Sequence, residues 1–244
     1  MTSVYTTSVA DCFRDVTFVV DSSGSINRND DTNWDKTLQF VADVVREFDI
    51  GPDDVQVSFV LFGREATVEW DFTAEQDKDK LIEDILGMRY LDSWTNLNDA
   101  LYLTRTKVYA PGGGVRERSV KATVILTDGE DNIPEPGTPL TLQNATLCKE
   151  DGIWLMTVAV SSGVDEARLH QIISSPFDYY YVDDFDALQT IVTKIKTEIC
   201  LGPHWGKFYL VYIFMLLSER YVDHAFLSHL RYCHFRRIYE KFHL

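Results

Sequence analysis

VTFVVDSSGSIN, residues 16–27, joins an apolar run to a loop of small hydroxyl residues behind one aspartate. The apolar run is typical of a buried β-strand. A carboxylate and three serine hydroxyls therefore stand at the mouth of a hydrophobic core. Three kinds of site compete to explain them: a phosphate-binding loop, a serine nucleophile, or a site for a hard metal ion.

The rest of the chain alternates strands with helices. Apolar runs predict strands at 16–21, 55–63, 65–72, 121–128, 153–160 and 178–183. Helical periodicity and helix stop signals predict helices at 32–48, 77–86, 95–110, 141–152, 165–173 and 186–200. Gly63 and Arg64 form the short link between the second and third strands, which permits a hairpin and forbids a parallel crossover. The sequence therefore predicts a doubly wound, Rossmann-like α/β fold, with a mostly parallel six-stranded sheet, one antiparallel edge strand, and helices on both faces.

Charge and composition divide the chain. Its 244 residues are 45% apolar, enough for a full core, and its net charge of −15 argues against nucleic acid or anionic membranes as partners. The tail 201–244 differs, because it holds six of the 23 Lys and Arg residues but only three of the 38 Asp and Glu residues. We therefore predict an N-terminal extension at 1–11, a domain at 12–200, and a separate tail at 201–244.

Neither end of the chain predicts a membrane or secretion segment. The N-terminal stretch 1–13 has no basic segment followed by an apolar one, so it is not a signal peptide. In the tail, the apolar run at 208–217 is ten residues long, whereas a spanning helix needs about 20. No membrane span is expected.

Polar side chains that could bind a ligand gather in three segments at the predicted carboxyl edge of the sheet: 21–25, 93–96 and 126–131. A phosphate loop needs several glycines and a lysine, but the first segment has one glycine and no lysine. A serine nucleophile needs a base, and the one histidine before residue 201 is His170, on a predicted helix far along the chain. A hard cation fits these segments better.

Mg²⁺ prefers oxygen ligands and keeps several waters. Ser23, Ser25 and Thr95 offer neutral hydroxyl oxygens, while Asp21 and Asp128 supply negative charge directly or through water. With few direct carboxylates, the ion would stay electrophilic and take an outside carboxylate as its last ligand. The first loop alone is explained as well by an aspartate and serines that cap the next helix. The matching threonine and aspartate segments favour the metal site.

The motifs DVTFVVDSSGSI, SWTNLNDAL and VILTDGEDN, in this order, resemble those of the von Willebrand factor A domain with its metal-ion-dependent adhesion site. The stretch DIGPDDVQVSFVLFG and the flanking cysteines are most similar to the extracellular matrix branch, the matrilin- and collagen-VI-like domains. The resemblance covers residues 12–200.

This resemblance implies roles for the site residues. Ser23, Ser25 and Thr95 would bind Mg²⁺ (or Mn²⁺) directly, Asp21 and Asp128 would usually act through water, and an acidic side chain of a partner would complete the octahedron.

Two cysteines bracket the predicted domain. From spacing alone, a bridge between Cys12 and Cys200 and a pair of free thiols are equally open. The resemblance implies the bridge.

Other residues near the motifs carry weaker signals. Trp94 precedes Thr95 where the family usually has small residues, so it would shape or partly shield the ligand face. Glu130 and Asp131 lie beside the site as solvated acids or as a rim. Asn144 begins an N-glycosylation sequon on a predicted helix.

Together these features predict a non-catalytic adhesion or protein–protein interaction module. It would bind an extracellular matrix or cell-surface protein such as collagen, outside the cell, as part of a larger protein or a fragment without its signal peptide. The alternative is an intracellular scaffold domain in a multiprotein assembly, in which the metal site is incidental. The missing signal peptide favours this alternative, and the bracketing cysteines oppose it. A metal-assisted hydrolase would need a general base, for which only Glu130 or Asp131 could serve.

Overall fold

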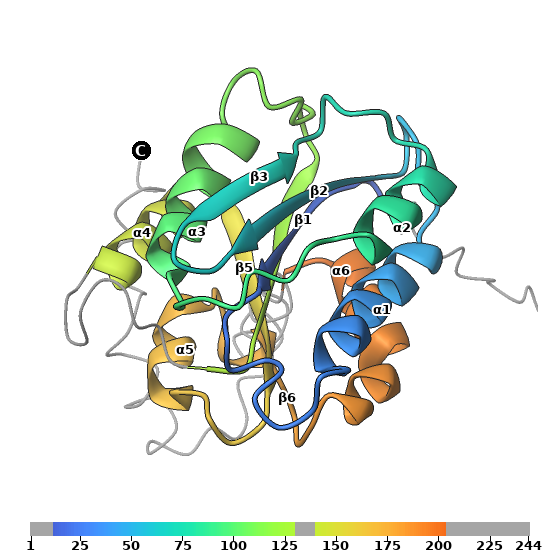
Figure 1. The fold of residues 1–244 in the computed structure, drawn as a ribbon. Coiled ribbons are helices and arrows are strands. Elements are labelled where there is room, and N and C mark those ends of the chain that lie inside the picture. Colours follow the sequence, from blue (N-terminus) through green and yellow to red (C-terminus); the bar gives the residue numbers. More distant parts are fainter. Residues whose placement is uncertain (1–11, 130–139, 204–244) are drawn as a thin grey trace, which may run out of the picture. The chain divides into compact units, whose positions relative to one another are not determined.

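The computed structural model describes residues 12–129 and 140–203 (Figure 1). These form a six-stranded sheet in the order β3-β2-β1-β4-β5-β6. The strands are β1 (Arg14–Asp21), β2 (Val55–Phe62), β3 (Ala66–Trp70), β4 (Val120–Thr127), β5 (Ile153–Val160) and β6 (Tyr179–Val182). All neighbouring strands run parallel except β2 and β3, which form the predicted antiparallel hairpin. The predicted fold class is confirmed.

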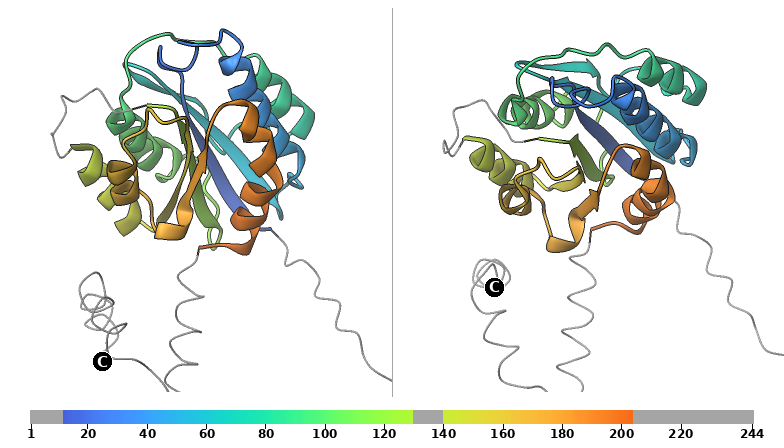
Figure 2. Two further views of the ribbon diagram at one scale, coloured as in Figure 1. Left: turned by 90° about the horizontal axis from the view of Figure 1, so that it is seen from below. Right: turned by 60° about the horizontal axis from the view of Figure 1, so that its bottom comes forward.

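Within the described residues, six α-helices lie against the sheet, on both of its faces (Figure 2). They are α1 (Asn33–Arg46), α2 (Lys78–Leu86), α3 (Leu97–Leu103), α4 (Leu140–Glu150), α5 (Glu166–Ile172) and α6 (Val192–Leu201). Successive side chains of a strand point to opposite faces. Accordingly, Phe18 and Val20 pack in the core under α1, α2 and α6, and Val19 packs in the core under α3, α4 and α5.

Two predicted helices are less regular than their sequence period suggests. The helix predicted at 95–110 divides into α3 and a π-helical segment, Thr104–Val108, because the N–H of Tyr109 donates to the Thr104 carbonyl at 3.0 Å. The hydroxyls of Thr104 and Thr106 bond to carbonyls one turn earlier, a pattern that bends helices. The helix predicted at 186–200 begins as a 3₁₀ segment, Asp186–Ile191, before α6.

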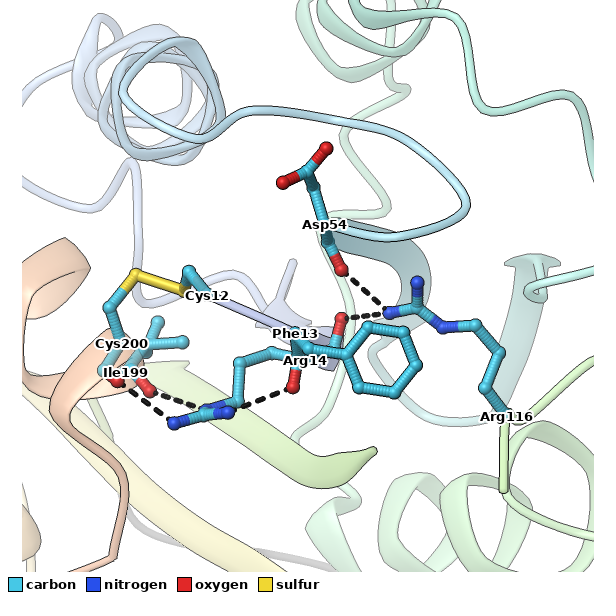
Figure 3. Close-up of a disulfide and its surroundings, with 7 residues drawn as sticks. All are labelled: Cys12, Phe13, Arg14, Asp54, Arg116, Ile199 and Cys200. Atoms are coloured by element: carbon cyan, nitrogen blue, oxygen red, sulfur yellow. Dashed lines mark hydrogen bonds between the residues drawn. A yellow bond between two sulfur atoms is a disulfide. The ribbon is translucent and has the colours of Figure 1, made fainter. Parts of the chain in front are cut away.

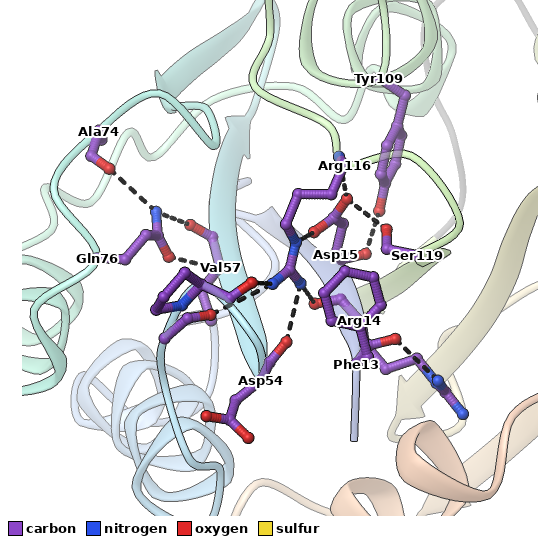
Figure 4. A network of polar contacts seen from close by, with 12 residues as sticks. Phe13, Arg14, Asp15, Asp54, Val57, Ala74, Gln76, Tyr109, Arg116 and Ser119 are labelled. Carbon is purple, nitrogen blue, oxygen red and sulfur yellow. Dashed lines mark hydrogen bonds and ion pairs between the residues drawn. The ribbon is translucent and has the colours of Figure 1, made fainter. Parts of the chain in front are cut away.

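Arg116 lies at the end of the sheet where β1 begins, opposite the loop after Asp21, and we call this end the base of the sheet. Figure 4 shows its polar contacts. Its side-chain Nε donates to Asp15 at 2.8 Å and its backbone N–H donates to the same carboxylate at 2.7 Å. Its two terminal nitrogens donate to the carbonyls of Arg14, Gly51, Pro52 and Asp54. The guanidinium has five N–H donors, and here each has an acceptor. The Asp15 side chain is fully buried and that of Arg116 is 15% exposed, so this is a buried ion pair with satisfied hydrogen bonds.

A disulfide between Cys12 and Cys200 closes the same end, with the two Cα atoms 4.9 Å apart across 188 residues of sequence (Figure 3). Beside it, the Arg14 guanidinium donates to the carbonyl of Ile199 at 3.1 Å and to that of Cys200 at 2.8 Å. The first strand therefore holds the C-terminal turn of α6 by a covalent bond and by hydrogen bonds. The pairing that the family resemblance implies is present in the structure.

No helix among the described residues is long and apolar enough to cross a membrane. The apolar run 208–217 and the extension 1–11 lie outside the described residues. The predicted domain limits at residues 12 and 200 stay predictions.

Replacing Arg116 tests the buried pair. We expect Arg116→Met to lower the free energy of unfolding by about 3–5 kcal/mol, because Asp15 keeps its buried charge and loses its partner. The matched control is Arg89→Met, which removes a pair between the exposed Arg89 and the partly buried Glu69 and should cost less than about 1 kcal/mol. If urea denaturation gives the same loss of unfolding free energy for both variants, the buried pair stabilises the fold no more than the control pair does.

Removing the disulfide tests the clamp on α6. The double variant Cys12→Ala, Cys200→Ala should lose up to about 4–5 kcal/mol of unfolding free energy, because the unfolded chain regains the freedom of a long loop. A reducing agent should destabilise the wild-type protein and leave the double variant unchanged. If the reductant has the same effect on both, the bridge contributes nothing to stability.

Candidate metal centre

Asp21 ends β1 and is completely buried. One of its carboxylate oxygens accepts a hydrogen bond from the Ser23 backbone N–H at 2.9 Å, and the other accepts from the Thr127 hydroxyl at 2.7 Å. Because Thr127 ends β4, the strand beside β1, the carboxylate joins the ends of two adjacent parallel strands. The Asp21 side chain therefore links the first and third polar segments.

Ser23, Ser25 and Asp128 form a short chain of polar side chains. The hydroxyl oxygens of Ser23 and Ser25 lie 3.0 Å apart, and the Ser25 hydroxyl donates to the Asp128 carboxylate at 2.7 Å. Gly129 follows directly, and a Cβ at that position would lie 3.3 Å from the Ser25 hydroxyl oxygen. The side chains of Asp21, Ser23, Ser25 and Asp128 thus lie side by side, although Asp128 is about a hundred positions from the other three in the sequence.

Thr95 comes from the second polar segment. Its side chain is only 4% exposed, and it lines a narrow cleft together with Thr127, Gly129 and Arg168 of α5. The segment is attached to the first loop, because the Gly24 N–H donates to the Ser93 carbonyl at 2.8 Å. Of the predicted ligands, Ser23, Ser25 and Asp128 are thus linked through their side chains. Asp21 accepts from the Ser23 backbone and from Thr127, and Thr95 lies against the same strand end.

The electrostatics of the two carboxylates favour a cation. Burial, followed by repulsion from Asp128, raises the pKa of Asp21 to about 7. Burial also raises the pKa of Asp128. Two acids that resist ionisation in a buried position would be stabilised as carboxylates by a positive ion.

The donor set matches a hard cation better than a soft one. The described residues 12–129 and 140–203 contain no group of three or more His, Cys, Asp and Glu side chains placed to hold a metal. The predicted site has two carboxylates and takes its remaining oxygens from hydroxyls, which suits Mg²⁺ or Mn²⁺ rather than a thiolate- or imidazole-rich zinc site.

Sequence reasoning missed two groups that hold the site together. Thr127 lies within the quoted strand-end motif, and its place just before Asp128 was the available signal. Tyr90 donates its hydroxyl proton to the Ser23 carbonyl at 2.9 Å. It lies in a segment without periodicity, so no sequence pattern marked it.

The weaker candidates differ in their surroundings. Trp94, predicted to shape or shield the ligand face, is 60% exposed. The side-chain amide of Asn144 donates to Asn98 at 2.8 Å, so the nitrogen that would carry a glycan is engaged between α4 and α3. Its glycosylation stays a prediction. Glu130 and Asp131 lie outside the described residues.

Three comparisons place this chain among known proteins. The sequence profile of the von Willebrand factor type A domain matches residues 15–194. The collagen alpha-1(XII) chain of Notophthalmus viridescens is 30% identical over 190 residues, which is 76% of this chain and 19% of that one. Matrilin-1 of Homo sapiens is 26% identical over 194 residues, which is 77% of this chain and 37% of that one. This chain therefore spans less than half the length of either relative.

Among solved structures, proximal thread matrix protein 1 from the mussel byssus, with a zinc-occupied MIDAS motif, has a TM-score of 0.70 and 27% sequence identity. The match covers 78% of this chain and 47% of that one. The five predicted ligand positions all lie inside the region that the family profile matches.

The raised pKa of Asp21 predicts a pH dependence in metal-free protein. Because the folded pKa of about 7 exceeds the unfolded value, protonation of Asp21 stabilises the fold at low pH, and this contribution is lost as the pH rises through 7. The free energy of unfolding should therefore fall from pH 5 to pH 7.5 more steeply in the wild-type protein than in Asp21→Asn. Parallel pH profiles of the two proteins would mean that Asp21 titrates as an ordinary carboxyl.

Proposed function

This chain belongs to the von Willebrand factor type A domain family, as its three motifs predicted, and we propose that it is a non-catalytic adhesion module that binds a protein of the extracellular matrix or cell surface. Contact would run through a divalent cation, Mg²⁺ or Mn²⁺, and an acidic side chain of the partner. The observation that carries this proposal is the convergence of Ser23, Ser25 and Asp128 at the ends of β1 and β4.

The residues present fit a divalent ion. Ser23, Ser25 and Thr95 would hold it through neutral hydroxyl oxygens, and the charges of Asp21 and Asp128 would balance it. A bound ion would supply an electrophilic position for a carboxylate from outside. The chain's own contribution is to keep these oxygens in place and the two aspartates buried.

Several observations support an extracellular matrix setting. The Cys12–Cys200 disulfide is typical of oxidising compartments and weighs against the intracellular scaffold. The relatives include a collagen chain and matrilin-1. The strongly acidic net charge of −15 suits a partner with basic patches around its acidic contact residue. We assign the module to residues 12–200 and treat 201–244 as a separate tail.

The absence of catalysis is part of the proposal. A hydrolase would need a general base beside the ion. His170, the histidine of the described region, packs its ring 4.6 Å from that of Tyr179 and lies 3.5 Å from Glu166. Neither contact is with a residue of the proposed centre.

Partner binding tests the proposal. Against immobilised fibrillar collagen and matrix proteins, we expect binding in Mg²⁺ that EDTA abolishes and that Ser25→Ala and Thr95→Ala weaken by about tenfold or more, because each variant removes a proposed ligand. Thr106→Ala, which removes an exposed hydroxyl bonded only to its own helix, is the matched control and should bind normally. If neither EDTA nor the substitutions at Ser25 and Thr95 weaken binding, the partner is not held through a metal ion.

A further inference from the structure

A second loop, residues 87–96, holds the loop that carries the two serines. We name it the support loop. Its Leu91 N–H donates to the Ser22 hydroxyl at 2.8 Å, and its Ser93 carbonyl accepts from the Gly24 N–H at 2.8 Å. The two loops also pack closely, because a Cβ on Gly24 would lie 2.9 Å from a carboxylate oxygen of Asp92. The support loop therefore holds the residues on both sides of Ser23, through the Ser22 side chain and the Gly24 backbone.

Tyr90 adds a side-chain contact at the centre of this arrangement. Its hydroxyl donates to the Ser23 carbonyl at 2.9 Å and accepts from the Asn27 N–H at 3.3 Å. One oxygen atom thus joins two backbone groups that lie on either side of Ser25. The loop between them cannot change its curvature without breaking one of these bonds.

The ring of Tyr90 is itself held in place. It packs against Trp34 of α1 with the ring centroids 5.5 Å apart. The indole N–H of Trp34 donates to the Met88 carbonyl at 3.1 Å, which ties the start of the support loop to the same helix. The hydroxyl is therefore presented from a packed ring and not from a freely rotating side chain.

We propose that Tyr90 is a positioning residue for the metal centre, which sets the spacing of the Ser23 and Ser25 hydroxyls through the backbone between them. This inference rests on the proposed function. Tyr90 touches no proposed ligand oxygen. It acts by holding the Ser23 peptide. Both hydroxyls are then in place before an ion binds, and binding costs little loss of loop conformational entropy.

The variant Tyr90→Phe separates this role from simple packing. It keeps the ring against Trp34 and removes only the hydroxyl. The matched control is Tyr109→Phe, whose hydroxyl donates to the carbonyls of Asp15 and Ala122 at the base of the sheet. Both variants lose one phenol hydroxyl that bonds to two backbone groups, which is buried in Tyr109 and partly buried in Tyr90, but only Tyr90 lies beside the centre.

The measurement is the dissociation constant for Mn²⁺, obtained by titrating each protein and recording the free Mn²⁺ signal by electron paramagnetic resonance. The melting temperature of the metal-free protein serves as a second readout. We expect Tyr90→Phe to weaken Mn²⁺ binding by about tenfold with little change in metal-free melting temperature. Tyr109→Phe should lower the melting temperature and keep the Mn²⁺ affinity of the wild-type protein.

The outcomes are distinguishable. If wild-type protein binds Mn²⁺ and Tyr90→Phe binds it equally well, the positioning role is wrong and the proposed function stands. If Tyr90→Phe and Tyr109→Phe lose affinity in step with their loss of melting temperature, the effect is general destabilisation and the positioning role is again wrong. If wild-type protein does not bind Mn²⁺, the proposed metal centre fails and this inference fails with it.

Discussion

The carboxylate of Asp21 is buried without residual exposure at the end of the central strand, beside a second acid, Asp128. Burying a charge is costly unless it is paired or hydrogen-bonded. The chain satisfies the carboxylate with the Ser23 N–H and the Thr127 hydroxyl, but it places no cationic side chain against it among the contacts of the described residues. The hydroxyl-rich surroundings are explained if a cation from solution binds there and balances the buried negative charge.

The two ends of the sheet are built differently. At the base, Arg116 saturates its donors on Asp15 and four carbonyls, and the disulfide from Cys12 to Cys200 fixes the first strand to the last helix. At the other end, hydrogen bonds between the loops and the packing of Tyr90 on Trp34 hold the polar segments together. Because the base is held rigidly, the parallel strands keep fixed positions, and the loops that follow them start from fixed points at the opposite end of the sheet. The contacts that close the fold and the proposed binding site therefore lie at opposite ends of the sheet.

Much of this architecture could be predicted from sequence, since long apolar runs and a short hairpin connection leave few alternative topologies. The π-helical turn at 104–108 escaped prediction because threonine hydroxyls bonding back to their own helix do not alter its hydrophobic period. At the site, the residue types and their order predicted that Ser23, Ser25 and Asp128 would converge. The supporting contacts of Thr127 and Tyr90 depend on tertiary packing between loops, for which local sequence has no signature.

The most direct test of the metal centre is a crystal structure of the protein grown with Mn²⁺, with diffraction recorded at the manganese absorption edge. Our account predicts an anomalous peak bounded by the hydroxyl oxygens of Ser23, Ser25 and Thr95, with the carboxylates of Asp21 and Asp128 around it. An ordered loop region at high resolution with water alone at that position would contradict it.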